Sequence, residues 1–194
     1  TNLVAVGKYT PVIGDETTQT AKSAYSLLSG LCLDAIQVWW GGNYYADVLP
    51  PSPGWIVWDK DNTGHFADCE LAWTNQNRAA RIFEHRWNGM LKASEQGQRR
   101  VHPTQKPIAL AFEIFKEYGD SGGLILDPFL GSGISLLAAE ELGDWQVIGL
   151  ELVPAYIGVT IHRWENLTGE KAHQINFQQH TGLKPVLTSQ ISHI

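Results

Sequence analysis

A glycine-rich turn contains the residues of this sequence that are best suited to ligand chemistry. An apolar run, Leu124 to Leu126, leads into Asp127-Pro128-Phe129-Leu130-Gly131-Ser132-Gly133, and an Ala/Leu/Glu-rich run follows. Glycines let a ligand approach the backbone closely, and the start of a helix offers free N–H groups. Glu151 ends the next apolar run, where its carboxylate can accept hydrogen bonds from ribose hydroxyls. This arrangement predicts a pocket for an adenosine-type cofactor.

The elements around this turn have the pattern of a doubly wound α/β protein. The run 124–126 predicts a strand buried on both faces, as in a parallel sheet, and the run to Leu142 predicts a helix. Further elements follow from apolar spacing, turn residues and helix-start prolines. The predicted strands are 35–40, 55–58 and 145–150, with a strand pair over 69–73 and 80–83. The predicted helices are one from Thr18 or Thr20 to Gly30, a short one over 43–49, one from Pro107 to Tyr118 and one from Pro154 to Gly169. The apolar stripe is Ile108, Ala111, Phe112 and Phe115 in the third of these helices and Ile157, Ile161 and Trp164 in the fourth.

Composition restricts the protein to a globular class with one domain. The chain is 43% hydrophobic and 18% charged, and no apolar run approaches the roughly 20 residues that span a membrane. No signal-peptide pattern is present. Cys32 and Cys69 lack metal-ligand spacing, which favours buried thiols in a reduced, cytoplasmic protein over a disulfide. The sequence begins at Thr1, which we interpret as a processed, trimmed or partly recorded product.

Charge is distributed unevenly along the chain. The net charge is −6, yet residues 78–100 hold six basic and two acidic side chains, a local balance of +4. The rest of the chain is therefore at −10. This asymmetry indicates a basic face on an acidic body, although an arginine-rich solvated loop has the same composition. Few apolar residues occur from Asn88 to Arg100, so we expect a mobile surface segment there.

Three features occur together: the turn Asp127-Pro128-Phe129-x-Gly131-Ser132-Gly133, the acid Glu151, and His102-Pro103-Thr104-Gln105-Lys106-Pro107 upstream of both. This set resembles the amino-group DNA methyltransferases, which methylate adenine N6 or cytosine N4 with S-adenosylmethionine. The resemblance covers roughly Ala35 to Leu167, and Trp39 to Lys60 is similar to adenine-modifying members from phages and prophages. It implies a Rossmann-like, S-adenosylmethionine-dependent α/β fold of three layers around a central, mixed, mostly parallel sheet.

The resemblance also implies roles for individual residues. Backbone groups of Phe129 to Gly133 would meet the methionine part of the cofactor, Asp127 its ammonium group and Glu151 its ribose. Thr104 and Lys106 would reach the methionine carboxylate. The predicted cofactor-binding residues are Thr104, Lys106, Pro107, Asp127, Pro128, Phe129, Gly131, Ser132, Gly133 and Glu151.

The sequence departs from the family at its catalytic tetrapeptide. Members have Asp-Pro-Pro-Tyr or a close variant, whose acid and prolyl carbonyl accept hydrogen bonds from the target amine and whose aromatic ring stacks on the flipped base. No such tetrapeptide is present, because Leu49-Pro50-Pro51-Ser52 lacks both the acid and the aromatic ring. We expect the motif upstream of Thr1. The main alternative is a truncated or degenerate chain that binds cofactor without methylating. A dinucleotide oxidoreductase is a weaker alternative, because Gly-x-Gly-x-x-Gly is absent.

Together with the charge pattern, the resemblance divides the chain by function. Residues 1–169 are expected to form the methyltransferase domain, 78–103 within it the basic segment that recognises DNA, and 170–194 a polar C-terminal tail. We expect double-stranded DNA as the partner, N6-methyladenine as the product in a phage or restriction-modification setting, and a cytoplasmic location. No metal is expected, and a homodimer stays open. His102 and Lys106 also allow simpler interpretations, as a turn residue and a solvated lysine. The expected DNA contacts are Arg78, Arg81, Arg86, Lys92, Arg99 and Arg100.

Overall fold

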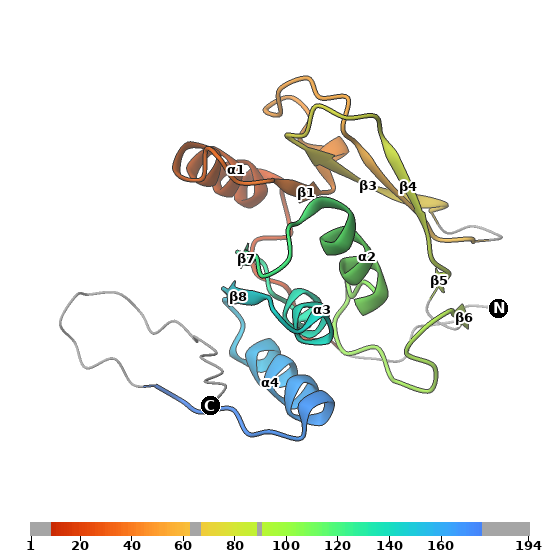
Figure 1. The fold of residues 1–194 in the computed structure, drawn as a ribbon, viewed down its shortest axis with the longest axis vertical. Coiled ribbons are helices and arrows are strands. Elements are labelled where there is room, and N and C mark those ends of the chain that lie inside the picture. The colour runs from red at the N-terminus through yellow and green to blue at the C-terminus, as the bar shows by residue number, and fades with distance from the viewer. Residues whose placement is uncertain (1–8, 63–66, 89–90, 176–194) are drawn as a thin grey trace.

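The computed structural model describes residues 9–62, 67–88 and 91–175, which form an α/β fold (Figure 1). Helices α2, α3 and α4 follow one another through the centre of Figure 1, with the larger sheet on one side of α2 and strands β7 and β8 beside α3. The helices and strands are α1 (Gln19–Leu31), β1 (Val38–Trp40), the 3-10 turn η1 (Gly42–Tyr44), β2 (Ile56–Asp59), β3 (Cys69–Thr74), β4 (Arg81–Glu84), β5 (Trp87–Asn88), β6 (Leu91–Lys92), α2 (Ile108–Tyr118), β7 (Leu124–Asp127), α3 (Ile134–Leu142), β8 (Gln146–Gly149) and α4 (Pro154–Thr168).

The larger sheet contains both parallel and antiparallel pairs. Its strand order is β1-β3-β2-β4, with β3 antiparallel to β1 and β2, and β4 parallel to β2. Strands β7 and β8 form a separate parallel pair. The expected α/β class with a mixed sheet is therefore confirmed. The expected pairing of 69–73 with 80–83 is wrong, because β2 lies between those two strands.

The main core joins the larger sheet to α2. Trp58 and Ile56 from β2 are completely buried there, and Trp87 from β5 packs into the same cluster. Burial of large aromatic and aliphatic side chains is the dominant favourable term in folding, so this cluster fixes α2 against the sheet. Its buried members are Ile56, Trp58, Ala72, Trp87, Leu110, Ile114 and Tyr118.

Strand β7 is less buried than the sequence predicts. The side chains of Leu124 and Leu126 are 65% and 41% exposed, while Ile125 between them is partly buried. Within the part of the chain that the structure describes, β7 pairs with β8 alone. The expectation of a strand buried on both faces is wrong for this reason. An apolar run shows that a strand can be buried, but neighbouring elements must supply the cover.

Several helices differ from the predicted ones in their ends or faces. Helix α1 continues past Gly30 to Leu31, and Thr18 at its start makes no side-chain capping bond. The short helix expected over 43–49 is reduced to η1. Gly169 ends α4 in the left-handed conformation, as predicted. The buried faces are turned relative to the predicted stripes and consist of Leu110, Ala111, Ile114 and Tyr118 in α2 and of Tyr156, Thr160 and Trp164 in α4.

The segment from Asn88 to Arg100 is attached to the body. Strands β5 and β6 pair with each other, with Trp87 opposite Lys92. The side chain of Glu95 is only 6% exposed and forms an ion pair with Arg163 of α4. Most of residues 91–100 are exposed, as expected of a surface segment, while Glu95 anchors the segment to α4. Its mobility stays a prediction.

Two further expectations concern thiols and membranes. Cys32 and Cys69 are free thiols, but Cys69 is exposed rather than buried. No helix within the described ranges is long and apolar enough to cross a bilayer. Those same ranges contain no group of three or more His, Cys, Asp or Glu side chains that could hold a metal ion.

Candidate cofactor site

The glycine turn connects β7 to α3, as the sequence predicts. Gly131 and Gly133 have φ values of +53° and +77°, a left-handed conformation that favours glycine. Gly133 is also the residue before α3, and its carbonyl accepts the first helical hydrogen bond, from the Leu137 N–H at 3.0 Å. Both glycines and Ser132 between them are buried. The turn therefore needs glycine for its backbone conformation, independently of any ligand.

Asp127 shapes the entrance to this turn. Its Oδ1 accepts a hydrogen bond from the Phe129 N–H at 3.0 Å, and its Oδ2 accepts one from the Ser135 hydroxyl at 2.6 Å. Burial raises the pKa of Asp127, while the hydrogen bonds from Ser135 and Phe129 act in the opposite direction. Each oxygen keeps a second lone pair that can accept a further donor.

Glu151 closes the turn from the end of β8. Its Oε2 accepts a hydrogen bond from the Gly131 N–H at 2.8 Å, and its Oε1 accepts one from the Val153 N–H at 2.8 Å. The side chain therefore faces the turn, as the sequence predicts. The second lone pair of each oxygen stays available for hydroxyl donors.

The His102–Pro107 segment packs directly on the turn. His102 is 6% exposed, and a Cβ placed on Gly131 would lie 3.3 Å from its Nε2. Its Nδ1 accepts a hydrogen bond from the Thr104 N–H at 3.2 Å, and its ring lies 4.2 Å from the Tyr156 ring between centroids. Burial lowers the pKa of His102, although the Glu151 charge opposes this shift. These contacts support the turn-residue interpretation of His102.

Lys106 lies in a cluster of charged and aromatic side chains. Its Nζ is 3.3 Å from a carboxylate oxygen of Glu70 and 5.2 Å from the centroid of a Trp40 ring. Lys60 contacts the other Glu70 oxygen at 2.6 Å. Burial alone would raise the pKa of Glu70, but Lys106 and Lys60 outweigh it and lower that pKa. Lys106 is therefore not a freely solvated lysine, and Pro107 beside it is fully buried at the start of α2.

Helix α4 also binds the turn. The Thr160 hydroxyl donates to the Gly131 carbonyl at 3.0 Å, and Arg163 Nη1 donates to the Ser132 carbonyl at 2.6 Å. Sequence reasoning missed these two residues together with Glu95. A signal was present, because Thr160 and Arg163 lie on the same helical face as the buried Tyr156, at i+4 and i+7.

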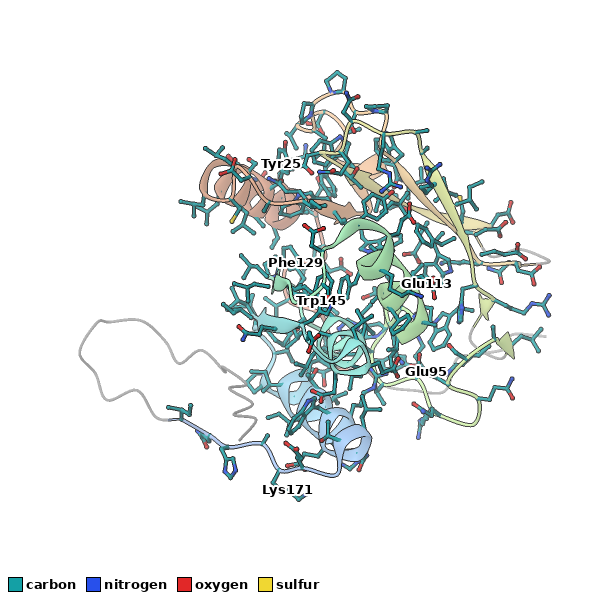
Figure 2. All side chains as sticks on the ribbon, in the orientation of Figure 1. Tyr25, Glu95, Glu113, Phe129, Trp145 and Lys171 are labelled. Carbon is teal, nitrogen blue, oxygen red and sulfur yellow. The ribbon has the colours of Figure 1, made fainter. Side chains whose placement is uncertain are left out.

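Three apolar side chains close in sequence to Asp127 and Glu151 are exposed. Phe129 is 51% exposed beside the end of β7 (Figure 2), and Leu150 and Leu152, which flank Glu151, are 45% and 71% exposed. Two hollows lie elsewhere, one of about 890 Å³ along α1 and one of about 280 Å³ beside 50–53. Neither is lined by a predicted cofactor residue. These three exposed side chains and the carboxylates of Asp127 and Glu151 make up the candidate site, which we call the ledge.

The basic side chains expected to contact DNA all have partners within the chain. Arg78 and Arg81 pair with Glu117 at the end of α2, and Arg86 pairs with Asp61. The other partners are the carbonyl of Gln98 for Lys92 at 2.8 Å, the carbonyls of His102 and Pro103 for Arg100, and an interaction within the chain for Arg99. Arg100 therefore helps to shape the His102–Pro107 segment.

Comparison with known proteins identifies the family of this chain. A family model described as DNA methylase, of the N6/N4 class, matches residues 58–163, more than half of the chain. The chain belongs to this DNA methylase family, and the expected amino-group DNA methyltransferase family is confirmed. The matched region includes both the His102–Pro107 segment and the glycine turn.

Individual relatives match shorter parts. Type II methyltransferase M.ScaI of Streptomyces caespitosus is 40% identical over 68 residues, which is 35% of this chain and 22% of that protein. M2.DpnII of Streptococcus pneumoniae is 35% identical over 79 residues, 41% of this chain and 29% of that protein. The matched part of the chain thus spans less than a third of the length of these curated relatives.

Among solved structures, the M1.HpyAVI–SAM complex has a TM-score of 0.48 and 22% identity, and covers 68% of this chain and 74% of that one. A putative DNA modification methylase of Thermus thermophilus, TTHA0409, complexed with S-adenosyl-L-methionine, has a TM-score of 0.42 and 21% identity. That match covers 63% of this chain and 57% of that one.

Proposed function

We propose that this protein acts in DNA methylation, with S-adenosylmethionine as the methyl donor and adenine N6 as the target. One observation supports the proposal above the others: the His102–Pro107 segment and Glu151 both contact the glycine turn between β7 and α3. His102 packs on Gly131, and Glu151 binds the N–H of the same residue. The family match covers both motifs.

The hydrogen-bond acceptors and apolar side chains of the ledge fit the chemical groups of this cofactor. Glu151 can accept hydrogen bonds from ribose hydroxyls through its remaining lone pairs, and Asp127 can accept them from the ammonium group. The exposed apolar side chains of Phe129, Leu150 and Leu152 offer surface to the adenine ring. When bound, S-adenosylmethionine would supply an electrophilic methyl group. The chain's own residues would bind and orient the nucleoside.

Thr104 and Lys106 would meet the carboxylate of the methionine part. Both belong to the segment that packs on the turn. The pKa of Asp127 is raised by burial, and the Lys106 charge is close enough to oppose part of that rise. Glu70 holds the Lys106 ammonium at 3.3 Å, which gives it a fixed position from which to attract an anion. We therefore assign Lys106 to binding the methionine carboxylate and do not interpret it as a solvated lysine.

Double-stranded DNA is the proposed partner, in a cytoplasmic setting. Residues 78–100 have a balance of +4 in a chain of net charge −6, so the basic segment is where phosphates would be attracted. Adenine is favoured over cytosine because Trp39 to Lys60 is similar to adenine-modifying members of the family. The target base would have to leave the stack to reach the ledge.

A second function has a specific observation in its favour. The 194 residues contain no Asp-Pro-Pro-Tyr, the tetrapeptide that holds the target amine in the family. A chain without that motif would bind S-adenosylmethionine and still transfer no methyl group.

One experiment separates these functions. The chain is incubated with duplex DNA and S-adenosylmethionine labelled in the methyl group, and the DNA is digested to nucleosides for mass spectrometry. Labelled N6-methyladenine supports the proposal, and labelled N4-methylcytosine corrects its target. Cofactor binding without any labelled nucleoside supports the binding-only function, and NAD serves as a control ligand that should not compete.

A further inference from the structure

Glu95 and Arg163 form a buried ion pair behind the glycine turn. Their charged atoms, Oε1 and Nη2, are 2.7 Å apart, and the two side chains are 6% and 11% exposed. Figure 2 labels Glu95 on the loop that follows β6. The Ile108 N–H at the start of α2 donates to the other Glu95 oxygen at 3.1 Å, and Arg163 also donates to the Ser132 carbonyl. A buried pair is favourable only with such additional hydrogen bonds, and this one has them.

The backbone of Glu95 is strained. Its φ is +52°, in the left-handed region that side chains other than glycine, asparagine and aspartate rarely adopt. The residue starts a turn closed by the Gln98 N–H, which donates to its carbonyl at 3.2 Å. Glycine would fit this conformation without strain, so the turn alone does not call for glutamate. The strain is compensated by the contacts of the carboxylate.

The pair joins two regions with different proposed tasks. On one side is the basic segment, 78–103, which includes Glu95 itself. On the other side is the glycine turn, whose Ser132 carbonyl is bound by Arg163 at 2.6 Å. Trp87 adds a second attachment, because its Nε1 donates to the Gln105 carbonyl at 3.0 Å. The basic segment is thus bound to the parts of the chain that build the ledge.

Peptide geometry shows how the contacts from α4 orient the backbone of the turn. Thr160 and Arg163 hold the carbonyls of Gly131 and Ser132 toward α4. In a planar trans peptide the N–H of one residue points opposite to the carbonyl of the residue before it. The Thr160 contact with the Gly131 carbonyl therefore directs the Ser132 N–H away from the Thr160 hydroxyl. The Arg163 contact holds the next peptide, whose Gly133 N–H donates to the Leu130 carbonyl at 2.8 Å. Loss of the Arg163 contact would remove one of the two hydrogen bonds that fix this Ser132–Gly133 peptide.

We propose that Glu95 and Arg163 are positioning residues that hold the glycine turn in its ligand-binding conformation and couple it to the basic segment. Binding of duplex DNA to that segment would thereby stabilise the turn, and cofactor and DNA would bind cooperatively. The cooperative part rests on the proposed function. The positioning part concerns the chain alone.

The test measures amide hydrogen exchange of peptides covering 130–137 in the wild-type chain, with and without a duplex of mixed sequence. Glu95→Gln keeps the shape of the side chain and removes its charge. Glu95→Gly removes the side chain and relieves the backbone strain. The double variant Glu95→Gln/Arg163→Met leaves no unpaired buried charge. Glu165 lies on α4, as Arg163 does, and forms a more exposed pair with Lys171 beyond the end of that helix. Glu165→Gln, which breaks this pair, is the matched control. All measurements are made at a temperature at which circular dichroism shows each variant to be folded.

We expect exchange of the turn to become about tenfold faster in both Glu95 variants and in the double variant, and to be unchanged in the control. Duplex DNA should slow exchange of the turn in the wild-type chain but not in the variants. Affinity for S-adenosylmethionine should fall in the variants, because the Ser132 backbone is no longer held in one orientation. If Glu95→Gly keeps wild-type exchange, or if DNA slows exchange equally in every variant, the proposal is overturned.

The failure of the proposed function would look different. A wild-type chain that binds no S-adenosylmethionine would refute that function, while the exchange rates without ligand would still decide whether Glu95 and Arg163 position the turn. The response of the exchange rates to DNA decides the coupling without any use of the cofactor.

Discussion

Glu151 accepts a hydrogen bond from the Gly131 N–H at 2.8 Å, so the acid that follows β8 closes the turn that follows β7. The two strands run parallel, and their carboxyl ends therefore lie at the same edge. A single side chain thus combines a structural task, holding the turn, with the proposed task of accepting ribose hydroxyls.

We expect Glu151→Gln to affect both tasks. The amide has one acceptor oxygen instead of two, so either the Gly131 N–H or the Val153 N–H loses its partner. A hydrogen bond to a charged group contributes about 1.5–3 kcal/mol, and we expect the free energy of unfolding to fall by about that amount. Urea titration followed by circular dichroism measures it.

Glu141→Gln is the control for this substitution, because Glu141 is an exposed carboxylate on the neighbouring helix α3. It should leave both stability and cofactor affinity within error of the wild type. Equal behaviour of the two variants would show that Glu151 does not hold the turn.

Gly133→Ala should destabilise the protein strongly. A Cβ at this position would lie 2.4 Å from Thr160 Cγ2, in addition to the strain of a φ of +77°. Overpacking costs about 1–3 kcal/mol, and a left-handed conformation adds about 1–2 kcal/mol. Gly143→Ala is the matched control, because Gly143 has a φ of +90° but no atom within 4 Å of the added Cβ. Thermal unfolding that ranks the two substitutions equally would contradict the packing of α4 on the turn.

At Gly131 a larger side chain would act through His102. The added Cβ would lie 3.3 Å from the imidazole Nε2, so Gly131→Val should displace the ring as well as strain the backbone at a φ of +53°. We expect lost cofactor binding together with lowered stability.

The buried imidazole of His102 should make stability depend on pH. Burial lowers its pKa below the ordinary value of 6.5, so between the two values the unfolded chain binds more protons than the native one. His102 therefore contributes stability that is present above about pH 6.5 and is lost as the pH falls toward its native pKa. Urea unfolding between pH 7.5 and 5 should show a weaker pH dependence for His102→Gln than for the wild type.

The pKa of His85 is also lowered by burial, so its contribution to the pH dependence must be measured separately. The Glu95 charge opposes its shift. The His85→Gln variant should remove a different share of the pH dependence. If His102→Gln follows the wild type at every pH, the ring is not buried in its neutral form.

The proposed DNA contacts are best tested at Arg81 and Arg86. Both side chains are 48% exposed, whereas Arg100 donates to backbone carbonyls and its substitution would disturb the fold. Each phosphate contact contributes about 0.9 to the slope of log affinity against log salt. Arg81→Gln/Arg86→Gln should therefore reduce that slope by about 1.8, measured by fluorescence anisotropy of a labelled duplex between 50 and 200 mM salt.

Lys171→Gln is the control for charge alone, because Lys171 is 78% exposed beyond the end of α4 and outside the basic segment. Its slope should match that of the wild type. A double variant with an unchanged slope would show that the basic segment does not contact phosphates.

The local part of the fold could be predicted from the sequence. The strand–turn–helix–strand unit, the left-handed stop at Gly169 and the contact between the two motifs follow from glycine positions, apolar runs and the resemblance. These features depend on backbone geometry over short distances, which residue types specify directly.

The rest of the fold depends on contacts between residues that are far apart in the sequence. The order of the larger sheet could not be predicted, because apolar strands do not identify their neighbours. The exposure of Leu124 and Leu126 depends on which elements cover them. Glu95 lies in a polar stretch, and its partner Arg163 is 68 residues further along the chain, so no local pattern indicates that the two are buried together.

The central claim is that the ledge around Asp127 and Glu151 binds S-adenosylmethionine, and calorimetric titration tests it most directly. We predict saturable binding at one site by the wild-type chain. Asp127→Asn should bind at least about tenfold more weakly, because it removes the charge that faces the ammonium group. Relief of the buried charge and loss of one acceptor oxygen act on its stability in opposite directions, so urea unfolding of both proteins accompanies the titration. A folded wild-type chain that takes up no S-adenosylmethionine, or equal affinity of the two proteins, would contradict the account.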